Sequence, residues 1–176
     1  MKKYLIVLAI PIILIIIVSA DMAKMNQQSS WDLGTKKVAH VAIIVNDIEA
    51  TTKDYAEVLG IDPPKIKLGV SPEHFMGQPT EGKAKMAFIN LDNITLEFFE
   101  PVGGPTAWQD FLDTRGEGMH HLGFWVEGLD EHVKNFASRD MPVIQERSAD
   151  WGRYCYIDAT SGLGIWIELL ERNKPE

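Results

Sequence analysis

Hydrophobic and polar positions follow the same order twice along this chain. Each copy begins with a histidine, continues with five mostly apolar residues and breaks at two polar or glycine residues before a helical pattern starts. The apolar stretches are Val41–Val45, after His40, and Leu122–Val126, after His121. A continuous apolar run favours a buried strand, so the pattern predicts a strand and then a helix in each copy.

The helical pattern has the same register in both copies. Its apolar face holds Ile48, Tyr55 and Leu59 in the first copy and Leu129, Val133 and Phe136 in the second. These spacings fit one face of an amphipathic helix. Gly60 predicts the end of the first helix, because glycine readily adopts the left-handed conformation that follows a helix. Pro142 limits the second helix.

The two copies also end alike. The stretch ITLEFFEP from Ile94 aligns with IWIELLER from Ile165, and Ile, Glu and a second Glu are identical at positions one, four and seven. Four further strands are predicted between helix and final strand, two in each copy: Lys65–Val70, Ala84–Leu91, Val143–Arg147 and Arg153–Asp158. We expect turns at Asp92-Asn93 and at ATSGLG, residues 159–164.

The fold class that follows is α+β, with two tandem βαβββ modules. Module one covers residues 37–102, a linker with a short helix near Ala107–Thr114 covers 103–117, and module two covers 118–173. Residues 21–36 read as a polar tether. The sequence leaves open whether the two modules pair within one chain or across a homodimer.

The N-terminus has the composition of an export signal. Lys2 and Lys3 precede an apolar run from Tyr4 to Ala20 that ends in small residues. This pattern predicts either a signal peptide over residues 1–20 or an uncleaved membrane anchor over residues 4–20. In both cases we expect the remainder of the protein to be exported, in a periplasmic or extracellular location.

Charge and cysteine content exclude some functions. The formal net charge is −8 at pH 7, which argues against a basic nucleic-acid-binding surface. Cys155 is the only cysteine, so neither an intrachain disulfide nor a cysteine metal cluster can form. We expect Cys155 to be a small buried residue on a strand.

A histidine and a glutamate recur at equivalent places in the two copies. His40 and His121 open the first strands, and Glu97 and Glu168 lie in the last strands. All four interrupt apolar stretches, where a buried, unpaired carboxylate is costly. A divalent ion bound by two neutral imidazoles and two carboxylates removes that cost, and such a donor set suits Zn²⁺, Ni²⁺, Co²⁺, Fe²⁺ or Mn²⁺. The sequence therefore predicts a four-ligand metal site.

The remaining histidines are expected to play no part in this site. Strand alternation puts His120 on the face opposite His121, His74 lies in a loop-like stretch, and His132 lies on the polar side of a helix. Three aromatic residues share faces with the predicted ligands, and pocket lining and sheet packing both remain open for them: Phe99, Trp125 and Trp166.

Four motifs carry a resemblance to a known family: HVAIIVNDIEATTKDYAEVLG, LEFFEP, GEGMHHLGFWVEGLDEHVKNF and IWIEL. Together the chain from Lys37 to Arg172 resembles the vicinal oxygen chelate superfamily, which includes glyoxalases, methylmalonyl-CoA epimerases, extradiol dioxygenases and bleomycin-resistance proteins. The resemblance implies a U-shaped barrel around a metal, with ligands at the four predicted positions and Glu168 as both ligand and catalytic base. LEFFEP and GEGMHHLGF are most similar to methylmalonyl-CoA epimerase-like members.

The expected function is that of a metal-dependent isomerase, epimerase or lyase acting on a small carbonyl substrate through an enolate. A non-enzymatic protein that binds a small molecule or an antibiotic is the main alternative. An extradiol dioxygenase is a weaker one, because that chemistry uses two histidines and one carboxylate and Glu97 supplies a second carboxylate.

Overall fold

The computed structural model describes residues 32–69 and 71–173, and these residues follow the predicted repeat. The elements of module one are β1 (His40–Ile44), α2 (Ile48–Leu59), β2 (Lys67–Leu68), β5 (Ala84–Asn90) and β6 (Thr95–Pro101). The elements of module two are β7 (Gly118–Trp125), α4 (Leu129–Ala137), β8 (Val143–Ala149), β9 (Gly152–Ile157) and β10 (Trp166–Arg172). Between the modules lies α3 (Ala107–Arg115).

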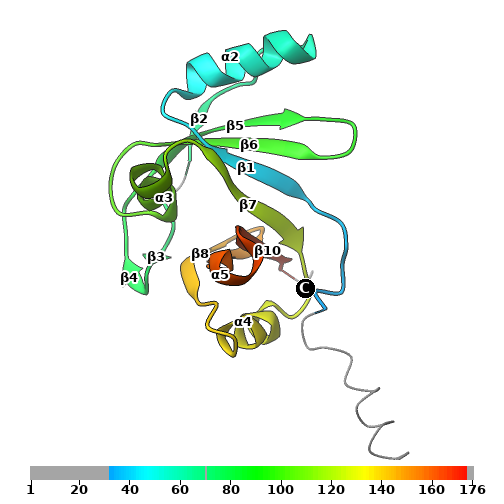
Figure 1. The fold of residues 1–176 in the computed structure, drawn as a ribbon, viewed down its shortest axis with the longest axis vertical. Coiled ribbons are helices and arrows are strands. Elements are labelled where there is room, and N and C mark those ends of the chain that lie inside the picture. Colours follow the sequence, from blue (N-terminus) through cyan, green and yellow to red (C-terminus); the bar gives the residue numbers. More distant parts are fainter. Residues whose placement is uncertain (1–31, 70, 174–176) are drawn as a thin grey trace, which may run out of the picture. The chain divides into compact units, whose positions relative to one another are not determined.

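The two modules join edge to edge in one mixed sheet. Its strand order is β2-β5-β6-β1-β7-β10-β9-β8-β3-β4. β1 and β7 are antiparallel neighbours at the join, and each runs parallel to the last strand of its own module. The sheet curls into a half-barrel, with α2 and α4 outside its two halves (Figure 1). Module pairing therefore occurs within one chain.

The sheet has an apolar core on each face. On the outer face of module one, Ile48 of α2 packs with Ala87 and Phe98, all of them fully buried. On the inner face, Trp108 and Phe111 of α3 pack with a group of aromatic strand residues, Phe99, Tyr156 and Trp166. The linker helix is thereby fastened to both modules.

The second glutamate of the repeated motif holds the start of each module's helix. Glu100 of β6 accepts a hydrogen bond from the backbone N–H of Ile48 at 2.9 Å. Glu171 of β10 accepts from the N–H groups of Gly128 and Leu129 at 2.7 and 3.1 Å. A carboxylate suits this position because the first N–H groups of a helix have no partner within it and carry partial positive charge. Both copies therefore keep a glutamate here.

Three local predictions differ from the structure. In the described part of the strand predicted over Lys65–Val70, only Lys67–Leu68 forms a strand, β2, which pairs with β5 alone at an exposed sheet edge. ATSGLG was expected to be a turn and contains the four-residue helix α5 (Thr160–Leu163), whose first N–H is bonded to the Asp158 carboxylate at 3.1 Å.

The third difference concerns the stretch around His74, which was predicted to be a loop. It forms two short strands, β3 (His74–Phe75) and β4 (Gln78–Pro79), and β3 pairs antiparallel with β8 of module two. The partner strand is far away in the sequence, so local pattern could not reveal the pairing.

The predicted signal peptide or anchor at residues 1–20 lies outside the described residues, as does most of the tether. In the part of the chain that the structure describes, none of the helices combines the length and apolarity needed to cross a bilayer. The localisation and the domain boundaries at the N-terminus stay predictions.

Candidate metal centre

The strand register brings the four predicted ligands to one face of the sheet. Ala42 of β1 pairs with Glu97 on one side and with His121 on the other. His40 pairs with Gly123, which in turn pairs with Glu168. Paired residues on neighbouring strands direct their side chains to the same face. The four side chains therefore lie on the inner face, where β1 and β7 meet.

Three of these side chains converge on one another. The Nε2 atoms of His40 and His121 lie 3.3 Å apart. Oε2 of Glu168 lies 2.5 Å from Nε2 of His40 and 3.4 Å from Nε2 of His121. The two histidines come from different modules, so the cluster exists only because the modules share a sheet.

Glu97, the fourth predicted ligand, approaches from a different side. Its Oε1 lies 3.5 Å from Nδ1 of His40, the ring nitrogen that faces away from His121. Ligand atoms of His40, Glu97 and His121 nevertheless fall within 4.8 Å of one another. The structure therefore places Glu97 beside the cluster, within ion-pair distance of the His40 ring.

Burial and the contacts between its own groups together set the protonation of the cluster. Burial lowers the pKa of His121, which is fully buried. Burial also raises the pKa of Glu97 to about 7, with a further contribution from the negative charge of Glu168. For Glu168 itself, contacts with the histidines outweigh the cost of burial and lower the pKa, and the nearer contact is with His40, whose own pKa Glu168 raises against the effect of burial. Glu168 is thus a buried carboxylate, ionised at neutral pH.

The donor set fits a divalent ion. Oε2 of Glu168 is buried and makes no well-formed hydrogen bond despite its close contacts with two imidazoles. Two ligands that each lie about 2.1 Å from one ion, at roughly 90–110° to each other, are themselves about 3.0–3.4 Å apart. The two contacts of Nε2 of His121 have this spacing, at 3.3 and 3.4 Å, whereas Oε2 of Glu168 lies closer to Nε2 of His40, at 2.5 Å. Imidazole nitrogen and carboxylate oxygen suit Zn²⁺ and its transition-metal neighbours. His40, His121 and Glu168 could therefore hold such an ion, with Glu97 at its side.

The prediction for His120 is wrong. The pairing of β7 with β1 shifts register after Ala42, so that Ala42 is opposite His121 and Ile43 is opposite Met119. His120 is the extra residue of this β-bulge, and a bulge interrupts the alternation of side chains. His120 consequently shares the inner face with His121 and is 1% exposed, with the Nδ1 atoms of the two rings 2.7 Å apart.

The three aromatic residues left open by the sequence divide into two groups. Phe99 stacks on Trp108 with ring centroids 5.1 Å apart, and Trp166 lies edge-on to His120 at 4.3 Å. Both are buried packing residues. Trp125 is 37% exposed beneath the guanidinium group of Arg172, 4.3 Å from the ring centroid.

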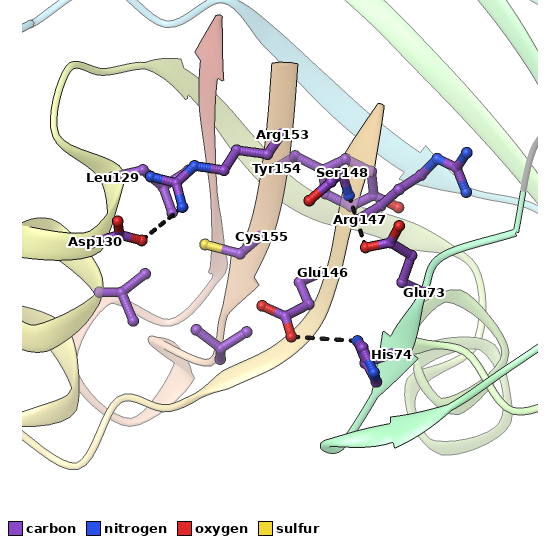
Figure 2. Close-up of a pocket in the computed structure, with 12 residues that line it drawn as sticks. Glu73, His74, Leu129, Asp130, Glu146, Arg147, Ser148, Arg153, Tyr154 and Cys155 are labelled. Atoms are coloured by element: carbon purple, nitrogen blue, oxygen red, sulfur yellow. Dashed lines mark hydrogen bonds and ion pairs between the residues drawn. The ribbon is translucent and has the colours of Figure 1, made fainter. Parts of the chain in front are cut away.

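A separate pocket of about 210 Å³ lies between α4, β8, β9 and β3, and its lining does not include the four predicted ligands. Figure 2 shows three pairs between residues that line it, whereas the guanidinium of Arg147 extends away from them. Asp130 binds Arg153 at 2.7 Å, and Glu73 accepts from the N–H of Ser148 at 3.0 Å. Cys155 is buried there, as predicted, and burial raises the pKa of its thiol to about 12, which makes it a poor nucleophile.

Comparison with known proteins finds a matching family and similar sequences. Residues 39–156 match the Glyoxalase/Bleomycin resistance protein/Dioxygenase superfamily. The chain is 28% identical over 120 residues to the mitochondrial methylmalonyl-CoA epimerase of Homo sapiens, across 67% of this chain and 61% of that enzyme. It is 25% identical over 140 residues to the uncharacterized protein YqjC of Bacillus subtilis, across 77% of this chain and 91% of that protein.

Solved structures show the same fold. Methylmalonyl-CoA epimerase from Mycobacterium tuberculosis superposes with a TM-score of 0.53 at 23% identity, covering 78% of this chain and 89% of that one. A methylmalonyl-CoA epimerase in complex with methylmalonyl-CoA and NH4+ superposes with a TM-score of 0.56 at 21% identity, covering 80% of this chain and 96% of that one.

Proposed function

Because the chain belongs to the Glyoxalase/Bleomycin resistance protein/Dioxygenase superfamily, we propose that it is a metal-dependent epimerase or isomerase. Its substrate is a small molecule with an acidic C–H next to a carbonyl or thioester group. His40, His121 and Glu168 hold a divalent ion, Glu97 completes the site, and Glu168 is also the catalytic base. Relatives named as methylmalonyl-CoA epimerases, at 22–30% identity, support this class of reaction.

One observation carries the proposal: a buried carboxylate oxygen and two buried imidazole nitrogens, drawn from both modules, converge within 3.4 Å of one another. Convergence of three donors on one point is what binding of a cation requires.

The chemistry follows from the difficulty of forming an enolate. A proton next to a carbonyl is lost only if the negative charge on the oxygen is stabilised, and a divalent ion supplies that stabilisation as a Lewis acid. A carboxylate placed beside the same carbon accepts the proton and contributes roughly 10²- to 10⁴-fold as a general base. Glu168 is ionised, as this role requires.

Epimerisation also requires a proton to return on the opposite face of the enolate. Glu97 and Glu168 flank opposite ring nitrogens of His40 and come from different modules. A second carboxyl group is thus available beside the proposed base, on the other side of the His40 ring.

The cellular compartment affects which substrates are candidates. If residues 1–20 direct export, as we propose, the enzyme meets compounds outside the cytoplasm. A small 2-oxo or hydroxy-carbonyl acid is then a candidate substrate, beside the CoA thioesters after which the relatives are named. A sequestering protein without activity is the second candidate, because the family match includes the bleomycin resistance proteins.

Metal content of the purified full-length protein, measured by elemental analysis, is the first test. We expect about one divalent ion per chain in the wild type, loss of that ion in His121→Ala and Glu168→Ala, and full retention in His132→Ala, a matched histidine on α4. A wild type that carries no ion and takes up none of Zn²⁺, Co²⁺, Ni²⁺, Fe²⁺ or Mn²⁺ would reject the proposal.

Exchange of substrate protons with ²H₂O distinguishes an enzyme from a protein that only binds the small molecule. The metal-loaded wild type is incubated with methylmalonyl-CoA and with a panel of 2-oxo and hydroxy-carbonyl acids, and deuterium at the α carbon is read by NMR. Catalysed exchange supports the epimerase or isomerase. Tight binding without exchange supports sequestration.

A further inference from the structure

We propose that His120 is a positioning residue, which fixes the tautomer of His121 so that the Nε2 lone pair faces the metal centre. The position of the proton on His121 is a property of the metal-free protein. Only its expected effect on metal binding rests on the proposed function. The inference starts from three groups linked by hydrogen bonds: Nδ1 of His121, the ring of His120, and the carbonyl oxygen of Ala107.

The contact between His120 and the Ala107 carbonyl determines which nitrogen of His120 carries the proton. Nε2 of His120 lies 3.3 Å from the carbonyl oxygen of Ala107, and a carbonyl oxygen only accepts hydrogen bonds. Nε2 of His120 therefore carries a proton. In a neutral imidazole the other nitrogen is then an acceptor.

The proton position on His121 follows from that on His120. The Nδ1 atoms of His120 and His121 lie 2.7 Å apart, a distance that requires one proton between them. Because Nδ1 of His120 is the acceptor, Nδ1 of His121 is the donor. Neutral His121 then has no proton on Nε2, and that nitrogen faces His40 and Glu168 with its lone pair available.

His120 is neutral because of its surroundings. It is 1% exposed and its neighbours are aromatic rings, with centroids 4.3–5.5 Å away, those of Phe111, Tyr156 and Trp166. A full positive charge in such a shell would be expensive.

The carbonyl group that accepts from His120 is itself held in place. Ala107 is fully buried at the first turn of α3, and its N–H donates to Oε1 of Gln145 at 2.9 Å. Thr106 caps the helix by accepting from the N–H of Gln109. The linker helix thus orients a carbonyl toward His120, and through it orients a ligand of the second module. Support of a metal-bound histidine by a hydrogen bond to its other nitrogen is a general requirement of such sites.

The decisive measurement is the ¹⁵N NMR spectrum of the metal-free full-length protein labelled at histidine. We expect His121 to be protonated at Nδ1 and unprotonated at Nε2, with signals assigned by their loss in His121→Ala. A His121 that carries its proton on Nε2 overturns the proposal, whatever the metal does.

Two variants of His120 test the consequence. His120→Gln keeps an acceptor for His121 and a donor for Ala107, whereas His120→Phe keeps the ring shape and neither hydrogen bond. We expect His120→Phe to weaken Co²⁺ binding by about 10- to 100-fold and to change the visible Co²⁺ spectrum, and His120→Gln to stay close to the wild type. His132→Phe on α4 is the control.

Equal Co²⁺ affinity in His120→Phe and the wild type overturns the proposal. So does a loss of affinity that is the same in both variants and follows their melting temperatures, since that pattern indicates packing alone. If the wild type binds no metal, the proposed function fails, and the ¹⁵N spectrum still decides where the proton lies.

Discussion

Gly123 and His40 form a cross-module pair in which the glycine makes room for the imidazole. They are opposite each other in the β1–β7 ladder, and a Cβ atom on Gly123 would lie 2.2 Å from Nε2 of His40. A side chain at this position would occupy the space that the ring needs. The glycine therefore belongs to the architecture of the site, although it contributes no ligand atom.

Gly123→Ala is expected to displace the His40 ring and to weaken metal binding at least 10-fold, with a loss of about 1–3 kcal/mol in stability from overpacking. Titration with Co²⁺ and thermal unfolding measure the two effects. The control is Gly162→Ala, where the added Cβ meets only the flexible end of Met141. Unchanged Co²⁺ affinity in Gly123→Ala would contradict the role assigned to the glycine.

Metal binding is expected to stabilise the fold, because the ligands come from both modules. Zn²⁺ at 100 times its Kd would add about 2.7 kcal/mol to the free energy of unfolding. Thermal unfolding with Zn²⁺ and with a chelator should therefore differ in the wild type. The difference should vanish in His40→Ala and persist in His74→Ala, and a shift of equal size in both variants would place the ion elsewhere.

Glu171 is expected to stabilise module two in a pH-dependent manner. The hydrogen bonds from the α4 N-terminus and Arg153 outweigh the cost of burial and lower the pKa of Glu171 below its ordinary 4.5. A carboxyl group with a depressed native pKa contributes stability above its unfolded pKa and loses it as the pH falls through the native pKa.

Glu171→Gln should therefore cost about 1 kcal/mol at pH 7, because a charged acceptor is replaced by a neutral one. The difference from the wild type should shrink below about pH 4.5, the ordinary pKa, and disappear once the native carboxyl is protonated. Urea unfolding between pH 7 and pH 3 measures it. Exposed Glu127→Gln serves as the control, and a pH-independent difference would refute the charge-based explanation.

Truncation of two phenylalanines on neighbouring strands compares the contribution of core packing to stability with that of a surface position. Phe98 of β6 is fully buried under α2, whereas Phe88 of β5 is 41% exposed. Phe98→Ala should lose about 3–5 kcal/mol, the usual cost of truncating a buried aromatic residue. Phe88→Ala should lose much less in the same urea unfolding experiment, and comparable losses would contradict the assigned core.

Much of the fold could be predicted from the local pattern of hydrophobic and polar residues. Strand and helix periodicities depend on neighbours within a few residues, so the repeat alone located both modules, and Gly60 marked the end of α2 with a φ of 67°. The identity of the second glutamates, Glu100 and Glu171, was visible in the alignment of the two copies, and the structure shows that each accepts hydrogen bonds at the start of its module's helix.

Strand alternation likewise predicted which residues share a face. The recurrence of a histidine and a glutamate in both copies predicted that His40, Glu97, His121 and Glu168 form one site, and alternation gave the face of each within its own strand. The family resemblance added the barrel and the role of Glu168. Neither source could show that Glu97 approaches the other nitrogen of His40, because that depends on ring orientation between three strands.

Tertiary structure alone decided the position of His120. The sequence by itself determined that two histidines are adjacent on a strand, and simple alternation then separates them. The register shift against β1 turns both rings inward, and a register is set by pairing between residues about 80 positions apart. For the same reason the pairing of β3 with β8 was invisible in the sequence: long-range hydrogen bonds depend on how the modules meet, and local periodicity carries no record of that.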